Sequence, residues 1–160
     1  MDRVNAILHN EKYKKYLNKI SLYEVDRKFC KHNIEHFLDV GRIAYIMVLE
    51  KKLKYSKEII YSIALLHDIG RWKQYEEGIS HEKASAELAK NILKDVDFND
   101  SEIEIILKAI LKHRKEQKAE KDELCNLIYM SDKLSRKCFS CSASSECNWK
   151  ESMKNLNIKY

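Results

Sequence analysis

The turn-forming residues of this chain constrain its fold most strongly. The 160 residues include no proline and only three glycines. Turns between β-strands depend on these two residues, because proline presets φ and glycine adopts positive φ without a steric penalty. All-β and α/β folds would lack the turn chemistry that they need, so the sequence predicts an all-α protein. Its length fits one domain with a hydrophobic core.

Charge is spread along the whole chain, with 30 basic and 25 acidic residues and a net charge of +5. No run resembles a basic arm, so we expect no nucleic-acid polymer as a partner, whereas a mild positive field suits a small phosphorylated substrate. The sequence contains neither a signal-like apolar segment at its start nor a run of about eighteen apolar residues. We therefore expect a cytoplasmic protein with no membrane partner.

Apolar residues recur with helical spacing in six segments. The expected helices cover about residues 11–20, 33–53, 57–69, 80–93, 99–113 and 123–136. Ser56, Ser80 and Asn99 are placed to cap three of them, and Asn99 with Glu102 resembles a capping box. Gly70 is expected to end its helix in the left-handed conformation. A charged connection is expected over residues 113–123.

Polar residues interrupt the apolar faces of five different helices, at His36, His67, His81, His113 and Asp132. One such residue is usually satisfied by the backbone or by an ion pair. Five would each cost several kcal/mol without a partner, so a shared cation site explains them better. Imidazoles and carboxylates together are ligands for iron, manganese, zinc or cobalt.

Asp68 directly follows His67, although neighbours on a helix point about 100° apart. At the end of a helix, just before Gly70, both side chains can converge on a metal beyond the terminus. The carboxylate of Asp68 has two oxygens and can bridge two ions, whereas each imidazole serves one. Four histidines and two aspartates therefore suit two ions better than one.

Five segments contain these residues: HNIEHFLDVGRIAYIM, LLHDIGR, SHEKASAELAKNIL, AILKHRKE and YMSDKLSR. Together they resemble the HD superfamily of metal-dependent phosphohydrolases. The two additional histidines match the six-ligand subgroup that binds two metals, which includes the diadenosine tetraphosphate hydrolases. The resemblance implies an all-α bundle of about six to seven helices. We expect this domain over residues 1–136, with a cysteine-rich extension, residues 137–160, packed on it.

The resemblance also implies the metal ligands and the reaction. One metal would be held by His36, His67, Asp68 and Asp132. Asp68 would bridge to a second metal, held by His81 and His113. The ions would be divalent, with iron as the first choice and manganese, zinc, cobalt or magnesium as alternatives. A hydroxide bridging them would hydrolyse a phosphate ester or anhydride of a nucleotide-like substrate.

Several side chains near these ligands are candidates for binding the substrate. Arg71 is expected to face the phosphate, where many members of the superfamily have lysine; its guanidinium would bind as a planar fork. Lys133 is the second candidate, with an ordinary surface lysine as the alternative. His32 is expected at an exposed helix start, with a substrate contact as the alternative.

Residues 71–79 are expected to form a lid, in which Trp72 and Tyr75 either stack on a base or pack internally. Arg27 and Arg42 are expected at the surface.

Two other functions fit the same ligand set. Some HD-superfamily proteins with six-ligand sites activate oxygen at a mixed-valent di-iron pair, so a di-iron oxygenase is one alternative. A module that senses nucleotides without turnover is the other, but such a module would be expected to lose metal ligands. Phosphate release under argon would favour the hydrolase, and oxygen consumption the oxygenase.

The cysteines suggest a further site. Cys138, Cys141 and Cys147 have the spacing C-x2-C-x5-C. Three thiols are one short of a closed tetrahedral site, and Cys30 could supply the fourth. Zinc or an iron–sulfur cluster is one interpretation, and a tail with reduced or redox-active thiols is the other. Cys125 is expected in the core.

Overall fold

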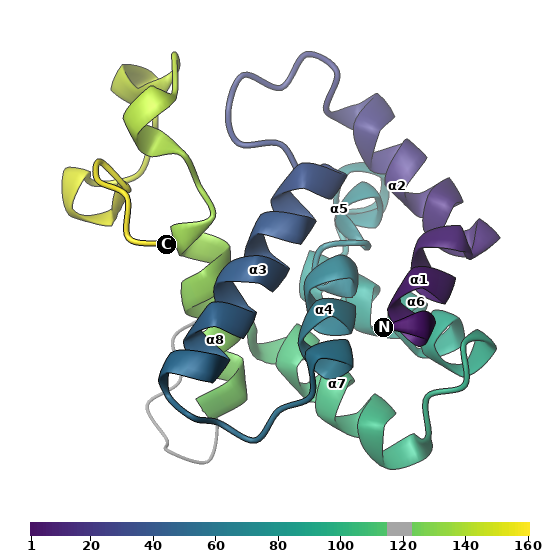
Figure 1. Cartoon of the computed structure of the whole chain (residues 1–160). Coiled ribbons are helices and arrows are strands. Elements are labelled where there is room, and N and C mark those ends of the chain that lie inside the picture. Colours follow the sequence, from purple (N-terminus) through teal and green to yellow (C-terminus); the bar gives the residue numbers. More distant parts are fainter. Residues whose placement is uncertain (115–122) are drawn as a thin grey trace.

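The computed structural model describes residues 1–114 and 123–160, and its described part is helical without any strand (Figure 1). The α-helices are α1 (Asp2–His9), α2 (Glu11–Tyr23), α3 (Ile34–Glu50), α4 (Lys57–Leu66), α5 (Arg71–Glu77), α6 (His81–Asp95), α7 (Asp100–Lys112) and α8 (Glu123–Leu134). Three 3-10 turns follow: η2 (Cys138–Ser140), η3 (Ser144–Glu146) and η4 (Glu151–Met153). The all-α prediction is confirmed. Most of the expected charged connection, residues 115–122, lies outside the described residues.

Two of the three expected helix caps form. The Ser56 hydroxyl accepts a hydrogen bond from the Ile59 amide at 3.2 Å. Asn99 and Glu102 form a complete capping box, in which each side chain accepts from the other residue's amide. Ser80 occupies the N-cap position of α6, but its side chain makes no capping hydrogen bond. Local sequence therefore placed all three helix starts.

Gly70 does not adopt the left-handed conformation that its position suggested. Its φ is −89°, and α5 begins at the next residue. A Cβ atom at Gly70 would lie 2.3 Å from the backbone nitrogen of Ser85 on α6. The Gly70 amide also donates to the Ser85 hydroxyl at 2.9 Å. Glycine is therefore required for the close approach of this turn to α6, not for positive φ.

The segment expected to be a lid is mostly helix α5, which packs between α2 and α6. Trp72 is 7% exposed, and its ring stacks on Tyr16 with the centroids 5.9 Å apart. The ammonium group of Lys19 lies 3.6 Å from the Trp72 ring centroid on α5. Trp72 is therefore a packing residue, the second of the two roles considered for it.

All eight helices contribute apolar side chains to one core. α3 packs along α4 and against α8, and α7 contacts α4, α6 and α8 (Figure 1). Cys125 belongs to this core with 3% exposure, as predicted. None of the described helices is long and apolar enough to span a membrane. The packing brings the ends of α4, α7 and α8 and the start of α6 towards the start of α3.

Candidate metal centre

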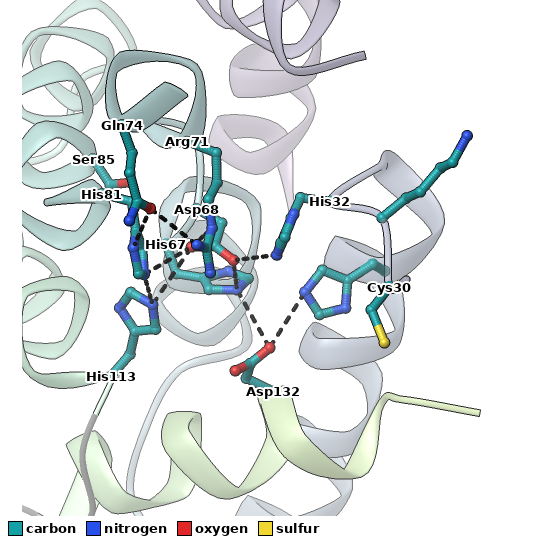
Figure 2. Close-up of polar contacts among 12 residues, drawn as sticks. Cys30, His32, His67, Asp68, Arg71, Gln74, His81, Ser85, His113 and Asp132 are labelled. Carbon is teal, nitrogen blue, oxygen red and sulfur yellow. Dashed lines mark hydrogen bonds and ion pairs between the residues drawn. The ribbon is translucent and has the colours of Figure 1, made fainter. Parts of the chain in front are cut away.

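Two groups of buried ligand atoms share Asp68 (Figure 2). The first group consists of His36, His67, Asp68 and Asp132, and the second of Asp68, His81 and His113. Within each group, one ligand atom from each residue lies within 4.8 Å of the others. The structure thus brings together all six residues that the sequence singled out as ligands, and Asp68 belongs to both groups.

The two carboxylate oxygens of Asp68 face different histidines. Oδ1 lies 3.3 Å from Nε2 of His81 and 3.6 Å from Nε2 of His113. Oδ2 lies 3.5 Å from Nε2 of His67. One carboxylate can therefore supply one oxygen to each group, which is the arrangement that a bridging ligand needs.

Asp132 completes the first group from α8. Its Oδ1 lies 3.3 Å from Nε2 of His36 and 3.9 Å from Nε2 of His67. The side chain of Asp132 is 6% exposed. This group therefore combines two imidazoles with one carboxylate of its own and the shared one, a donor set suited to a divalent transition metal.

The backbone fixes the orientation of two ligand imidazoles. Nδ1 of His67 lies 2.8 Å from the Ala64 carbonyl, and Nδ1 of His113 lies 2.6 Å from the Ile110 carbonyl. A carbonyl only accepts hydrogen bonds, so Nδ1 carries the proton in each neutral imidazole. Nε2 is then the nitrogen with the lone pair, and it points into the site.

Side chains orient the other two imidazoles. Nδ1 of His81 lies 3.0 Å from Oε1 of Gln74 on α5. Nδ1 of His36 lies 3.0 Å from the Ser135 hydroxyl at the end of α8. Both histidines therefore also present Nε2 to the centre, and all four ligand imidazoles have a partner outside it.

Burial favours the neutral form of three ligand imidazoles, those of His36, His67 and His81, whereas at His113 the contacts with Asp68 outweigh burial and raise the pKa. Burial is the main cause that lowers the pKa of His67 to about 3 and that of His81 to about 4. Burial alone would raise the pKa of Asp68, but Arg71 and the neighbouring histidines outweigh it and hold this pKa well below its usual value. Burial likewise opposes ionisation of Asp132, and its hydrogen bond with His36 helps to hold its pKa low. Neutral imidazoles with ionised carboxylates are the protonation states that bind metal.

Unsatisfied atoms at the centre indicate that a metal fits there. Nε2 of His67 and Oδ1 of Asp68 are buried, and neither makes a hydrogen bond. Leaving a buried acceptor unpaired costs about 1–3 kcal/mol, and more for a charged group. A divalent cation in each group would satisfy both atoms, Nε2 of His67 in the first group and Oδ1 of Asp68 in the second.

Arg71 and Lys133 both contact the ligand carboxylates. Nε of Arg71 lies 3.2 Å from Oδ1 of Asp68, and its Nη1 donates to Gln74 at 3.0 Å. Nζ of Lys133 lies 2.6 Å from Oδ2 of Asp132. The structure therefore places both predicted cations at the site. Arg42, in contrast, is exposed, as expected.

Sequence reasoning missed Arg136, which is 9% exposed. Its Nη2 lies 3.0 Å from Nε2 of His36 and 3.3 Å from Oδ1 of Asp132. Its Nη1 donates to the Lys31 carbonyl at 3.1 Å, which ties the end of α8 to the loop before α3. The spacing of four residues between Asp132 and Arg136 on one helical face was the signal available.

The exposed position expected for His32 is wrong, because this side chain is only 3% exposed. Its Nδ1 is hydrogen-bonded to the Glu24 carboxylate, and its Nε2 lies 3.5 Å from Oδ2 of Asp68. The backbone amide of His32 and the hydroxyl of Tyr75 also donate to Glu24, at 2.7 and 2.6 Å. Burial would raise the pKa of Glu24, but these hydrogen bonds outweigh it and lower the pKa to about 2. The ionised Glu24 thus orients the imidazole of His32 towards the centre, as a fifth imidazole beside the four ligand histidines.

A pocket of about 610 Å³ opens onto the first ligand group. His36 and Asp132 lie in its wall, and the cations that line it include Arg27, Arg71, Lys133 and Arg136. Arg27 keeps 34% of its side chain exposed, as a surface residue does, and it also lines this pocket; its Nε donates to the Cys30 carbonyl at 2.9 Å. A pocket of this size holds a small molecule, and its lining favours an anionic one.

Comparison with known proteins agrees with this geometry. The family model described as HD domain matches residues 33–137. An uncharacterized protein from Clostridium beijerinckii is 51% identical over 160 residues, the full length of both chains. The crystal structure of a predicted HD superfamily hydrolase from an uncultured Thermotogales bacterium has a TM-score of 0.63 and 24% identity, covering 89% of this chain and 81% of that one.

Proposed function

The chain belongs to the HD domain family, and on this premise we propose that it is a phosphohydrolase with two divalent metal ions. The observation that carries the proposal is the pair of buried ligand groups joined by the two oxygens of Asp68. A single-metal site would not need the second group, His81 and His113. Iron is our first choice of metal, because the ligands are mainly imidazole nitrogens with carboxylates; manganese, zinc, cobalt and magnesium are the alternatives.

Two divalent ions held in these groups would lower the pKa of a bound water and offset the charge of the phosphoryl oxygens. Positively charged side chains of the protein would bind and position the phosphate. Arg71 approaches the shared carboxylate from one side, and Lys133 and Arg136 lie beside Asp132 on the other. These cations can hold a phosphate between them, which positions phosphorus for in-line attack by water.

His32 is placed to handle a proton in this reaction. Its Nδ1 is held by the ionised Glu24, so its Nε2 is the nitrogen free to exchange a proton near Asp68. We assign it the role of general acid: as the imidazolium, with its Nδ1–H held by Glu24, it donates the Nε2 proton to the departing oxygen as the bond from phosphorus to that oxygen breaks, and it becomes the neutral imidazole.

The pocket favours a nucleotide-like phosphate ester or anhydride as the substrate. Its inner end has the cations that suit phosphate, and Trp149 lines its wall near Lys133, whose Nζ is 5.7 Å from the indole centroid. An aromatic ring in this position can stack on a base. Trp149, and not Trp72, is therefore the residue that we assign to base stacking.

The first test is the metal content of three variants beside the wild type. We expect two metals per chain in the wild type, about one in His81→Ala, and close to none in Asp68→Asn, because Asp68 serves both groups. The exposed His9→Ala is the matched control and should keep both metals. One metal in the wild type that is unaffected by His81→Ala would contradict the two-metal proposal.

The second test measures phosphate release under argon from nucleoside monophosphates, diphosphates, triphosphates and dinucleoside polyphosphates. We expect release with at least one of these classes, and loss of release in Asp68→Asn. Turnover that requires and consumes oxygen would instead identify an oxygenase. Intact nucleotides recovered after long incubation with protein containing both metals would identify a binding module.

A further inference from the structure

Four of the five cysteines line the pocket that opens onto the histidine–aspartate centre. Cys30, from the loop before α3, lines it together with three cysteines of the C-terminal segment: Cys138, Cys141 and Cys147. All four side chains are partly buried, and none forms a disulfide. Figure 2 shows the Cys30 thiol on the side of the site where the chain leaves α8. The fold thus gathers thiols that are far apart in the sequence.

The local backbone places two of these thiols on one side of a turn. Cys138 begins η2, and the Cys141 amide donates to the Cys138 carbonyl at 3.3 Å. Side chains at positions i and i+3 of a 3-10 turn eclipse each other, so both thiols lie on the same side. Cys147 closes the next turn, η3, where its amide donates to the Ser144 carbonyl at 3.4 Å. Pairs spaced C-x2-C on tight turns are the usual ligand arrangement of structural zinc sites.

An ion pair links the Cys30 loop to the C-terminal segment that carries the other three cysteines. Lys28 forms an ion pair with Glu146, one residue before Cys147. Burial raises the pKa of the Cys30 thiol; Arg136 opposes this rise, while Cys138 and Cys141 add to it.

The C-terminal segment, residues 137–160, has no core of its own. Ala143 is its one buried apolar residue, and the large hydrophobic side chains exposed on it are Phe139, Met153, Leu156, Ile158 and Tyr160. Asn155 anchors it to the end of α8 by donating to the carbonyls of Lys133 and Arg136, at 2.6 and 2.9 Å. A segment of this size without a core usually needs a metal or a covalent crosslink to hold its turns together.

We propose that Cys30, Cys138, Cys141 and Cys147 form a metal site with four thiolate ligands, separate from the histidine–aspartate centre. Four thiolates select zinc or an iron–sulfur cluster and disfavour hard ions such as magnesium or calcium. No three of the sulfurs lie within 4.8 Å of one another, so binding draws the 138–147 turns and the Cys30 loop together. Lys154 and Arg136 lie near these thiols and offset the negative charge of the site.

This site would stabilise one wall of the substrate pocket. Arg136 and Lys133 lie where α8 ends and the cysteine segment begins, and Trp149 lies two residues beyond Cys147. Closing the thiolate site would therefore fix the positions of these pocket residues. Its role is structural and does not depend on which reaction the histidine–aspartate centre catalyses.

The test is a titration of the full-length, chelator-treated protein with cobalt(II) under argon in the presence of a reductant that does not bind metal. Cobalt bound by thiolates gives a sulfur-to-metal charge-transfer absorption that imidazole and carboxylate ligands do not give. We expect this absorption in the wild type and its loss in Cys141→Ser. Cys125→Ala is the matched control, because this cysteine lies in the core between α7 and α8. His81→Ala should also retain the absorption.

Metal and acid-labile sulfide in anaerobically purified protein identify the native occupant. Zinc without sulfide or iron with sulfide supports the proposal if its amount falls by one site in Cys141→Ser but not in Cys125→Ala. Circular dichroism shows whether Cys141→Ser keeps its helices, and the double variant Cys30→Ser/Cys147→Ser provides an independent test. A wild type without the charge-transfer absorption, or one in which no metal depends on these cysteines, would overturn the proposal.

Discussion

Replacement of Gly70 by alanine should disturb the metal centre through the contact between the Gly70 turn and helix α6. Gly70 lies two residues after Asp68, and the added Cβ would lie 2.3 Å from the Ser85 nitrogen and 2.6 Å from the carbonyl carbon of Ala84. Both are backbone atoms of α6, so no side chain can rotate away. Because ordinary contact begins at 3.4 Å, the turn and α6 must move apart by about 1 Å.

The expected cost has two contributions. Overpacking of this kind costs about 1–3 kcal/mol of the free energy of unfolding. Loss of the hydrogen bond from the Gly70 amide to the Ser85 hydroxyl, now 2.9 Å long, costs about 1 kcal/mol more. The loss of about 2–4 kcal/mol should lower Tm by about 2–4 °C per kcal/mol in a chain of this size.

The displacement should also affect the second ligand group, because His81 is the first residue of α6. A misplacement of about 1 Å at reacting groups can lower a rate about 100-fold. We therefore expect Gly70→Ala to lose affinity for the metal in the second ligand group before it loses affinity for the metal in the first group. The measurements are thermal unfolding by circular dichroism and metal content during chelator competition.

The other two glycines serve as controls. At Gly41 a Cβ would meet Tyr61 ring atoms at 3.2 Å and the Ala64 Cβ at 3.3 Å, and the gain in helix propensity of about 0.5–1 kcal/mol partly offsets this. At Gly78 a Cβ would meet nothing within 4 Å, but φ is +70°, so alanine costs about 1–2 kcal/mol of strain. Equal stability of Gly70→Ala and Gly41→Ala, with unchanged metal affinity, would refute the reasoning.

Three further predictions concern stability and catalysis. Arg3→Gln, which breaks ion pairs with Glu58 and Glu102, should lower the free energy of unfolding at pH 7 by about 1 kcal/mol. Folding lowers the pKa of both carboxyl groups, so this stabilisation is present above their unfolded pKa and fades as the pH falls; a difference in urea unfolding that persists at about pH 3 would contradict it. Ser135→Ala removes the hydrogen-bond partner of Nδ1 of His36 and should weaken metal binding about 10–100-fold in chelator competition. Unchanged metal affinity would argue against an orienting role for Ser135. His32→Gln should keep both metals yet lower kcat about 100-fold or more, and an unaltered kcat would remove His32 from the mechanism.

The helices were predictable because their signals are local. Helical spacing of apolar residues and caps such as Ser56 and Asn99 act within a few residues, and the structure follows them. The short helices α1 and α5 escaped prediction, since segments of eight and seven residues give too little periodicity.

The six ligand positions were also visible in the sequence, for a different reason. Five of them are polar residues on apolar faces of the expected helices, and burial of such groups without a partner is too costly to recur on five helices; the sixth, Asp68, directly follows one of them. The sequence therefore indicated which side chains point inward. That they meet in two groups, with the oxygens of Asp68 facing different histidines, follows from the packing of the helices.

The sequence by itself determined an all-helical fold, the starts of its main helices and the inward-facing ligands. Only the tertiary structure decided the burial of His32 against Glu24, the contact of Arg136 with the centre and the gathering of Cys30 with the C-terminal cysteines. The physical reason is the range of the interactions. A helix is specified by contacts between residues three or four apart, whereas these groups meet through loops and chain ends whose paths depend on how the whole bundle packs.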